Sequence, residues 1–95
     1  MAKASEWRDL SAGFALLSDP TRLGILKRLA VGPKNVTALC DGLGLKQPKA
    51  SHHLGLMRMG RLVVGTRKGR SVVYVSDASA LKALGVAVGK LMPKK

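Results

Sequence analysis

The side chains with the most capacity for chemistry lie close together in the middle of the chain. Between residues 47 and 61 there are hydrogen-bond donors, acceptors and cations, and no carboxylate; the polar side chains expected on the side opposite the apolar residues are Gln47, Lys49, Ser51, His52 and Arg58. Amide, hydroxyl and imidazole groups can bond to base edges in a DNA groove, while lysine and arginine can bind phosphate. A helix face that meets only water usually mixes both signs of charge, so this face indicates a polyanionic partner.

One amphipathic helix can position these groups. Ala50, Leu54 and Met57 recur at the three- and four-residue spacing of a buried face, and Leu56 fits less regularly. Pro48 suits the first turn of a helix, where a missing N–H group costs nothing. The spacing therefore predicts a helix from about residue 47, with its polar side turned outward.

Two runs that are rich in β-branched residues, 62–66 and 71–75, follow this helix. They flank the segment 67–70, which contains Arg67, Lys68, Gly69 and Arg70, and predict a hairpin with a glycine turn. Three cations without an acid at its tip favour a phosphate or minor-groove contact over a solvated loop. Helix, strand, glycine turn and strand is the order of a winged helix-turn-helix.

Two further helices are expected before the polar helix. Asp19 and Pro20 can start one, with Leu23, Leu26, Leu29 and Ala30 inward and with Arg22, Lys27 and Arg28 on a solvated face, where Arg22 could touch a phosphate. Asn35 can cap a short helix whose inner face holds Val36, Leu39, Cys40 and Leu43. Gly42 and Gly44 mark a tight turn into the polar helix, which completes a helix-turn-helix pair over residues 35–60.

The ends of the chain predict amphipathic helices over residues 5–18 and 77–92. The first helix carries an apolar stripe that fits the protein's own core and a partner subunit about equally well; the stripe is Trp7, Leu10, Phe14 and Leu17. The hairpin closes the domain before the last helix begins, so that helix has little core of its own to cover. We therefore expect a partner subunit against its stripe, which is Leu81, Leu84, Val88 and Leu91.

Length and composition limit the possibilities. Ninety-five residues predict one domain. The net charge is +12, and residues 32–70 hold eight basic groups and one acidic group, so nucleic acid is the leading partner and an anionic membrane surface the second. A single cysteine, Cys40, excludes an internal disulfide and a four-cysteine zinc module. Without a signal peptide or an apolar run of membrane-spanning length, we expect a cytoplasmic protein.

With these pieces in place, the chain resembles the ArsR-type (ArsR/SmtB) family of bacterial winged-helix repressors from about Leu17 to Ser76. The matching pieces are residues 17–23 (Leu-Ser-Asp-Pro-Thr-Arg-Leu), Ile25-Leu26, Gln47, residues 51–54 (Ser-His-His-Leu), Leu62-Val63, Gly69-Arg70 and Tyr74. The resemblance implies a mainly α fold in the order α-α-α-α-β-β-α, a homodimer joined by its terminal helices, an inverted-repeat operator and release by an effector that it leaves unidentified. It assigns base reading to Gln47, Lys49, Ser51 and His52, and it makes His53 a partly buried residue within reach of a phosphate.

The metal sites of that family are incomplete in this sequence. Ala38-Leu39-Cys40 stands where the thiolate site has Cys-x-Cys, and Asp77-Ala78-Ser79 lacks the first histidine of the zinc site on the last helix. His52 and His53 point about 100° apart around a helix, so they cannot chelate one ion as an i, i+4 pair would. We therefore expect neither a metal nor another cofactor. Gly60-Arg61 also replaces the Ala-Gly usually found before the wing.

Two functions are compatible with these patterns. The first is a homodimeric repressor that reads a specific operator without a metal, and the second is an architectural or nucleoid-type nucleic-acid binder without an operator. Gln47, Ser51 and His52 favour the first, because they can make directed bonds to bases. An enzyme is disfavoured, since no acid pair, phosphate-cradling glycine loop or nucleophile beside a base is visible.

Overall fold

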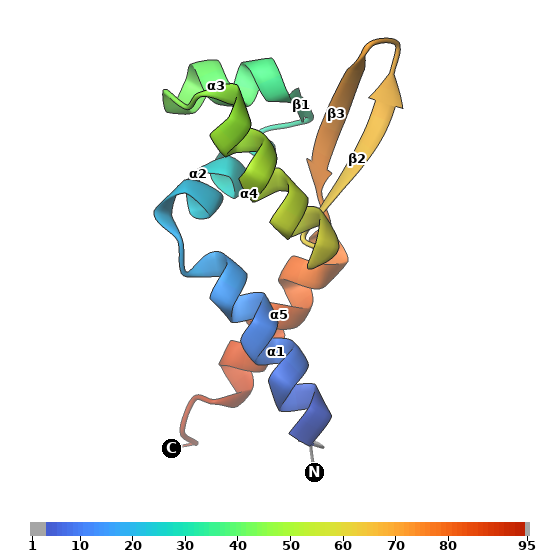
Figure 1. The fold of residues 1–95 in the computed structure, drawn as a ribbon. Coiled ribbons are helices and arrows are strands. Elements are labelled where there is room, and N and C mark those ends of the chain that lie inside the picture. The colour runs from blue at the N-terminus through green and yellow to red at the C-terminus, as the bar shows by residue number, and fades with distance from the viewer. Residues whose placement is uncertain (1–3, 95) are drawn as a thin grey trace.

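The computed structural model describes residues 4–94, with side chains from Glu6 onward. This part of the chain forms the helices α1 (Ala4–Leu17), α2 (Pro20–Leu29), α3 (Val36–Leu43), α4 (Gln47–Met59) and α5 (Ala78–Lys90), and the strands β1 (Lys34–Asn35), β2 (Val63–Lys68) and β3 (Ser71–Ser76). Helices α2 to α4 and the sheet form one end of the molecule, called the head below. Helices α1 and α5 cross at the other end and are called the stalk (Figure 1). The molecule measures 49 × 23 × 20 Å.

Helix starts follow from local sequence. Asp19, Asn35 and Asp77 each accept the backbone N–H of the residue three positions along, at 3.0, 2.8 and 3.0 Å. A short polar side chain in this position satisfies an N–H group that has no partner inside the helix. The predicted starts of α2, α3 and α5 are therefore confirmed, with Asp77 rather than Ser76 as the cap of α5.

The sheet has the strand order β1-β3-β2 and is antiparallel throughout. Strands β2 and β3 form the predicted hairpin, with Lys68 opposite Ser71 across a turn made by Gly69 and Arg70. Gly69 has a φ of +61°, a conformation that glycine adopts without steric cost. Strand β1 was not predicted: it is two residues long, and it exists only because Lys34 and Asn35 pair with Tyr74 and Val73.

The apolar core lies in the head and at its junction with the stalk; its buried members are Ile25, Leu26, Leu29, Leu39, Leu54, Met57, Leu62, Val63, Tyr74 and Leu84. In α4 the predicted inner face is confirmed, because Ala50, Leu54 and Met57 are fully buried. In α2 the prediction for Leu23 and Ala30 was wrong, since both are exposed. The buried side of α2 is instead centred on Ile25, Leu26 and Leu29, which face α3, α4 and β3.

The stalk is packed less completely than the head. Leu84 of α5 is only 7% exposed, and it lies against Gly13 of α1, where an added Cβ would approach the Leu84 Cδ2 atom to 2.9 Å. The expectation that Leu84 faces a partner was therefore wrong: this side chain belongs to the chain's own core. Trp7, Val88 and Leu91 are exposed, whereas Leu10, Phe14 and Leu81 are partly buried against the core. Within the described residues, no helix has the length and apolarity needed to cross a membrane.

Candidate nucleic-acid interface

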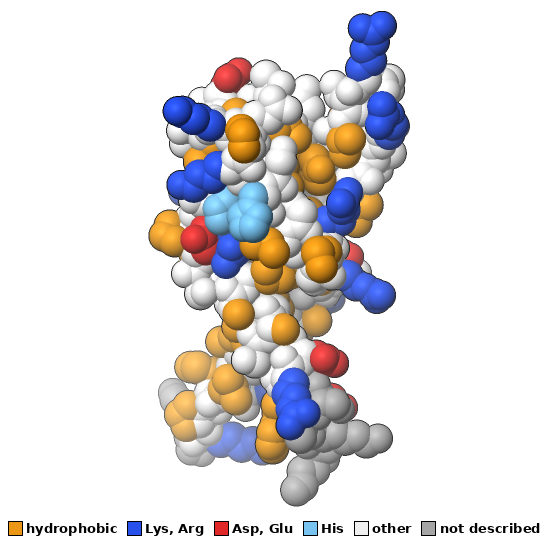
Figure 2. Space-filling model, viewed as in Figure 1, with side chains coloured by type: hydrophobic (Ala, Val, Ile, Leu, Met, Phe, Trp, Pro, Cys, Tyr) orange, Lys and Arg blue, Asp and Glu red, His pale blue; other side chains and the backbone are white. Residues whose placement is uncertain are grey.

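Helix α4 presents the predicted polar face to the surface. Its buried side anchors it on the core, and its opposite side leaves five polar side chains exposed: Gln47, Lys49, Ser51, His52 and Arg58. Figure 2 shows histidine at the middle of this face of the head, with lysine and arginine side chains on either side of it. The face combines groups that can bond to bases with cations that can bind phosphate.

The start of α4 differs from the starts of α2, α3 and α5. Its N-cap residue is Lys46, which makes no side-chain hydrogen bond to the helix, and Pro48 lies in the first turn as predicted. The positive end of the helix dipole is therefore not neutralised by a capping side chain, and Lys46 and Lys49 add charge beside it. Such a helix end favours an anion in front of it.

The hairpin of β2 and β3 extends from the head beside α4 (Figure 1). Arg67, Lys68 and Arg70 are all exposed at its tip. A two-residue turn with glycine in the left-handed region keeps this tip narrow. The structure thus places the predicted cations on a projecting ribbon, where a phosphate backbone or a minor groove could be reached.

His53 is placed differently from the other predicted site residues. It is 8% exposed, and its Nδ1 atom lies 3.2 Å from the Arg22 Nη1 atom. Burial is the main cause that lowers the pKa of His53 below 6.5; the Asp19 carboxylate opposes this shift and the Arg22 charge adds to it. A guanidinium can only donate, so Nδ1 accepts and the ring is neutral. The Nδ1 atom of His53 therefore faces α2 and is not available to a phosphate, and a phosphate contact through Nε2 stays a prediction.

Two arginines of α2 are tied to backbone carbonyls. Arg22 donates from Nε to the Leu16 oxygen at 2.6 Å, and Arg28 donates from Nη2 to the Gly42 oxygen at 2.6 Å. The predicted solvated face is confirmed for Lys27 and Arg28, which are exposed, whereas Arg22 is half-buried. Sequence reasoning missed these roles because the partners lie six to thirty-one residues away.

Metal ligands do not gather in the part of the chain that the structure describes. No group of three or more His, Cys, Asp or Glu side chains lies close enough to hold an ion among those residues. Cys40 is partly buried on α3. The absence of a metal site stays a prediction, because ligands can also be assembled between two copies of a chain.

The turn between α3 and α4 completes the geometry. Gly44 ends α3 with a φ of 65°, and the Leu45 N–H group bonds to the Cys40 oxygen at 3.0 Å, so α4 starts at once in a new direction. A short helix, a tight turn, a second helix with an exposed polar face and a basic hairpin together define a winged helix-turn-helix protein.

Comparison with known proteins identifies the family of this chain. The model of the family described as bacterial regulatory protein, arsR family, matches residues 19–63. The HTH-type transcriptional regulator Rv2034 of Mycobacterium tuberculosis is 36% identical over 80 residues, which are 84% of this chain and 75% of that protein. The chain belongs to the ArsR family of transcriptional regulators.

Two other relatives match over a shorter part. The regulator NmtR of Mycobacterium tuberculosis is 48% identical over 58 residues, covering 61% of this chain and 48% of NmtR. The arsenical resistance operon repressor of Escherichia coli is 42% identical over 62 residues, covering 64% and 53%. The chain therefore spans about half the length of these two proteins. All three relatives are named as regulators of transcription, in agreement with the prediction that the chain is not an enzyme.

Solved structures share the whole arrangement. An ArsR family transcriptional regulator, RHA00566, has a TM-score of 0.81 at 24% identity and covers 95% of this chain and 91% of its own. The homodimeric winged helix-turn-helix DNA-binding domain Mb0332 of Mycobacterium bovis has a TM-score of 0.76 at 29% identity, covering 92% and 83%. The predicted fold class is confirmed, with β1 as an addition.

Proposed function

We propose that this chain is a homodimeric repressor that reads an inverted-repeat DNA operator with α4 and holds the backbone with its wing. The observation that carries the proposal is the exposed face of α4, which has neutral polar groups at its start, cations on both sides and no carboxylate. Arg67, Lys68 and Arg70 give the wing the same sign of charge. Directed donors and acceptors distinguish this surface from one built of cations alone, which favours a specific operator over an architectural role.

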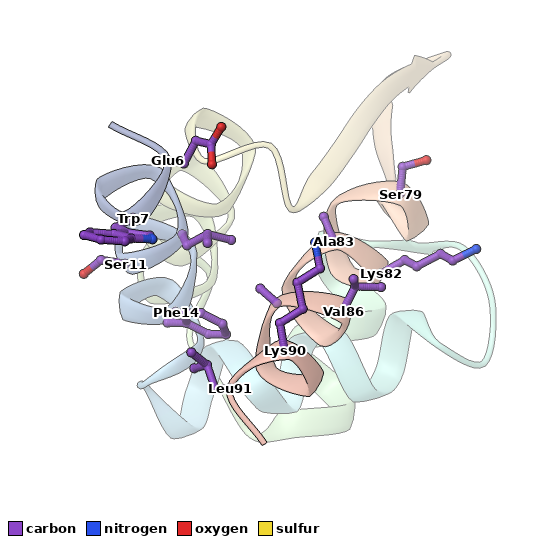
Figure 3. A pocket seen from close by; sticks show the side chains of 12 residues that line it. Glu6, Trp7, Ser11, Phe14, Ser79, Lys82, Ala83, Val86, Lys90 and Leu91 are labelled. Carbon is purple, nitrogen blue, oxygen red and sulfur yellow. The ribbon is translucent and has the colours of Figure 1, made fainter. Parts of the chain in front are cut away.

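The stalk supplies the dimer contact in this proposal. An apolar groove runs between α1 and α5, lined in part by Trp7, Phe14, Val86 and Leu91 (Figure 3). A second copy turned by a two-fold axis would cover this groove with the same residues. Glu6 lies at the groove with Lys82 and Lys90, so an acid of one copy can face a base of the other. Mb0332, a homodimer by its description, supports the same assembly.

The proposal includes repression without a metal ion. One copy holds a single cysteine, Cys40, whereas zinc takes four ligands and thiophilic ions take at least two or three thiolates. Release from DNA then depends on another signal, such as a small molecule, oxidation of Cys40 or a partner protein. A repressor of this kind acts in the cytoplasm, where bacterial DNA lies.

The test of specific reading is selection of bound sequences from random duplex DNA by the wild-type protein. We expect a palindromic consensus whose half-sites are separated by about one helical turn, since two copies of α4 must enter successive major grooves on one side. Tight binding without any consensus would instead identify an architectural protein. The duplex selected in this way, and a scrambled duplex of equal composition, serve as probes below.

Two single substitutions separate base contacts from phosphate contacts. Gln47→Ala should cost roughly 1–3 kcal/mol on the selected duplex and little on the scrambled one. Lys68→Ala should weaken binding to both duplexes equally and lower the slope against salt by about 1. Equal losses on both duplexes for Gln47→Ala would contradict base reading by α4.

Metal independence is tested on the protein–operator complex. Titration with zinc, cadmium, nickel and arsenite under reducing conditions should leave the wild-type complex intact. Release that persists in Cys40→Ser would show a site that lacks this cysteine, and release that disappears in Cys40→Ser would show a site that includes it; either result contradicts the proposal.

A further inference from the structure

One arginine in the first turn of α2 contacts both α1 and α4. The Arg22 Nε atom donates to the Leu16 oxygen at 2.6 Å, at the end of α1. The Nη1 atom of the same guanidinium lies 3.2 Å from His53 Nδ1, on the buried side of α4. The Arg22 backbone N–H is itself held by the Asp19 carboxylate at 3.0 Å. A single planar group therefore joins the stalk to the helix that carries the polar face.

The contacts of the Arg22 guanidinium fix the relative orientation of its partners as well as the distance between them. Carbonyl groups at the end of a helix lack partners within the helix and carry partial negative charge, which attracts a cation. The donors of a guanidinium are set in a rigid plane, so bonding to Leu16 on one side determines where His53 must lie on the other. Lysine, with one rotatable ammonium group, cannot hold both partners in the same way.

His53 in turn lies against a residue of the exposed face. The rings of His53 and His52 meet edge to face, with centroids 5.7 Å apart and an angle of 61° between their planes. His52 is exposed, whereas His53 is buried. The contacts thus run without interruption from the end of α1, through Arg22 and His53, to a side chain on the surface proposed to read DNA.

We propose that Arg22 is a positioning residue, which holds α4 in a fixed orientation relative to the end of α1. DNA reading by α4 then depends on the position of α1 in the stalk. Arg22 itself need not touch DNA. The inference rests on the proposed function, because it names the link between the dimer contact and the reading helix. A partner, ligand or modification that shifts α1 in the stalk would act on α4 through this side chain.

The same helix provides a matched control. Arg28 also donates from its guanidinium to a backbone oxygen at 2.6 Å, but that oxygen belongs to Gly42 at the end of α3. Replacing Arg28 removes an equal charge and a bond of the same kind, without touching α1 or His53. Differences between the two sets of variants therefore report on the link and not on charge or general stability.

The experiment compares Arg22→Ala and Arg22→Lys with Arg28→Ala and Arg28→Lys in the full chain. The first measurement is the ratio of dissociation constants on the scrambled and selected duplexes. We expect this ratio to fall about tenfold in both Arg22 variants, the effect of losing a hydrogen bond to a charged group, and to stay within about twofold of wild type in both Arg28 variants. If Arg22→Ala does not fold, Arg22→Lys decides, because it keeps the charge and most of the stem.

The second measurement is the titration of His53 followed by NMR without DNA. Arg22 is one of the charges that lower the pKa of His53, so this pKa should rise in Arg22→Ala and stay unchanged in Arg28→Ala. Asp19, Lys49 and His52 also act on the ring and are present in every variant. A role limited to general stability would not move this titration.

The results of these measurements distinguish failure of the Arg22 inference from failure of the proposed function. Wild-type protein that binds both duplexes equally would remove the proposed function, whatever the Arg22 variants do. Wild-type discrimination together with an undiminished ratio in both Arg22 variants would overturn the inference alone, as would an equal loss in the Arg28 variants. An unchanged His53 titration in Arg22→Ala would show that the two side chains do not interact in solution.

Discussion

In the head, helices α2, α3 and α4 close over the sheet, and most of the large apolar side chains are buried; in the stalk, α1 and α5 meet along one side and leave much of their apolar surface open. Leu54 and Met57 of the head are fully buried. Trp7 and Leu91 of the stalk are 59% and 79% exposed. The buried apolar area stabilises the head from within, whereas the apolar surface of the stalk can contribute only by contact with another molecule.

The same contrast between buried and exposed apolar side chains exists within α5, between Leu84 and Val88. They lie one turn apart on α5 and share an apolar stripe, but Leu84 is 7% exposed and Val88 is 47% exposed. The first side chain completes the core at the junction of head and stalk, and the second faces the open side. Position along a stripe therefore does not tell which residues stabilise the protomer and which stabilise the assembly.

The largest effect is expected for Leu84→Asp. This change buries a carboxylate without a partner against α1, and we expect it to lower the free energy of unfolding by roughly 4 kcal/mol or more, enough to unfold much of the protein. Urea denaturation followed by circular dichroism measures the loss. Stability close to wild type would place Leu84 outside the core.

Val88→Asp should instead leave the protomer folded and weaken the dimer. An acid among the exposed apolar side chains of α5 is expected to raise the dissociation constant of the dimer by roughly a hundredfold, which sedimentation at several protein concentrations would show. Val31→Asp is the matched control, because Val31 is 84% exposed on the head, away from the groove. An unchanged mass for Val88→Asp would remove this part of α5 from the dimer contact.

A smaller effect is expected where head and stalk join, at Arg61. Arg61 has a φ of 62°, a left-handed conformation that is unfavourable for residues with a side chain. Arg61→Gly should therefore raise the free energy of unfolding by about 1 kcal/mol. Gly60→Ala should act in the opposite direction, because an added Cβ would overlap the Leu16 side chain of α1. Destabilisation by Arg61→Gly would contradict this account of the junction.

The smallest effect concerns pH and His53, at the same junction. Burial lowers the pKa of folded His53, so between 6.5 and that lower pKa the unfolded chain binds a proton that the folded chain does not. The free energy of unfolding should therefore fall as the pH drops through this window. His53→Asn, which retains an acceptor but does not titrate, should show a shallower dependence in urea denaturation at several pH values. Equal slopes would mean that His53 is protonated equally in both states.

The sequence predicted those features that depend on neighbouring residues. Asp19, Asn35 and Asp77 act on N–H groups three residues away, and the buried side of α4 repeats within four residues. The rest depends on contacts between distant segments. Arg22 meets His53 across 31 positions, and no local pattern marks the pair. The same holds for Leu23, whose apolar side chain suggested burial although it lies on the open side of α2.

The two residues of β1 have a mechanical consequence. The backbone of Asn35 pairs with Val73 of the wing, while its side chain caps α3 by accepting the Ala38 N–H group. Asn35 therefore connects the wing directly to the start of α3, so a bend of the wing would displace the first turn of α3. A force applied at Arg70, at the tip of the hairpin and three residues from Val73, would be transmitted to the helix-turn-helix pair through Asn35.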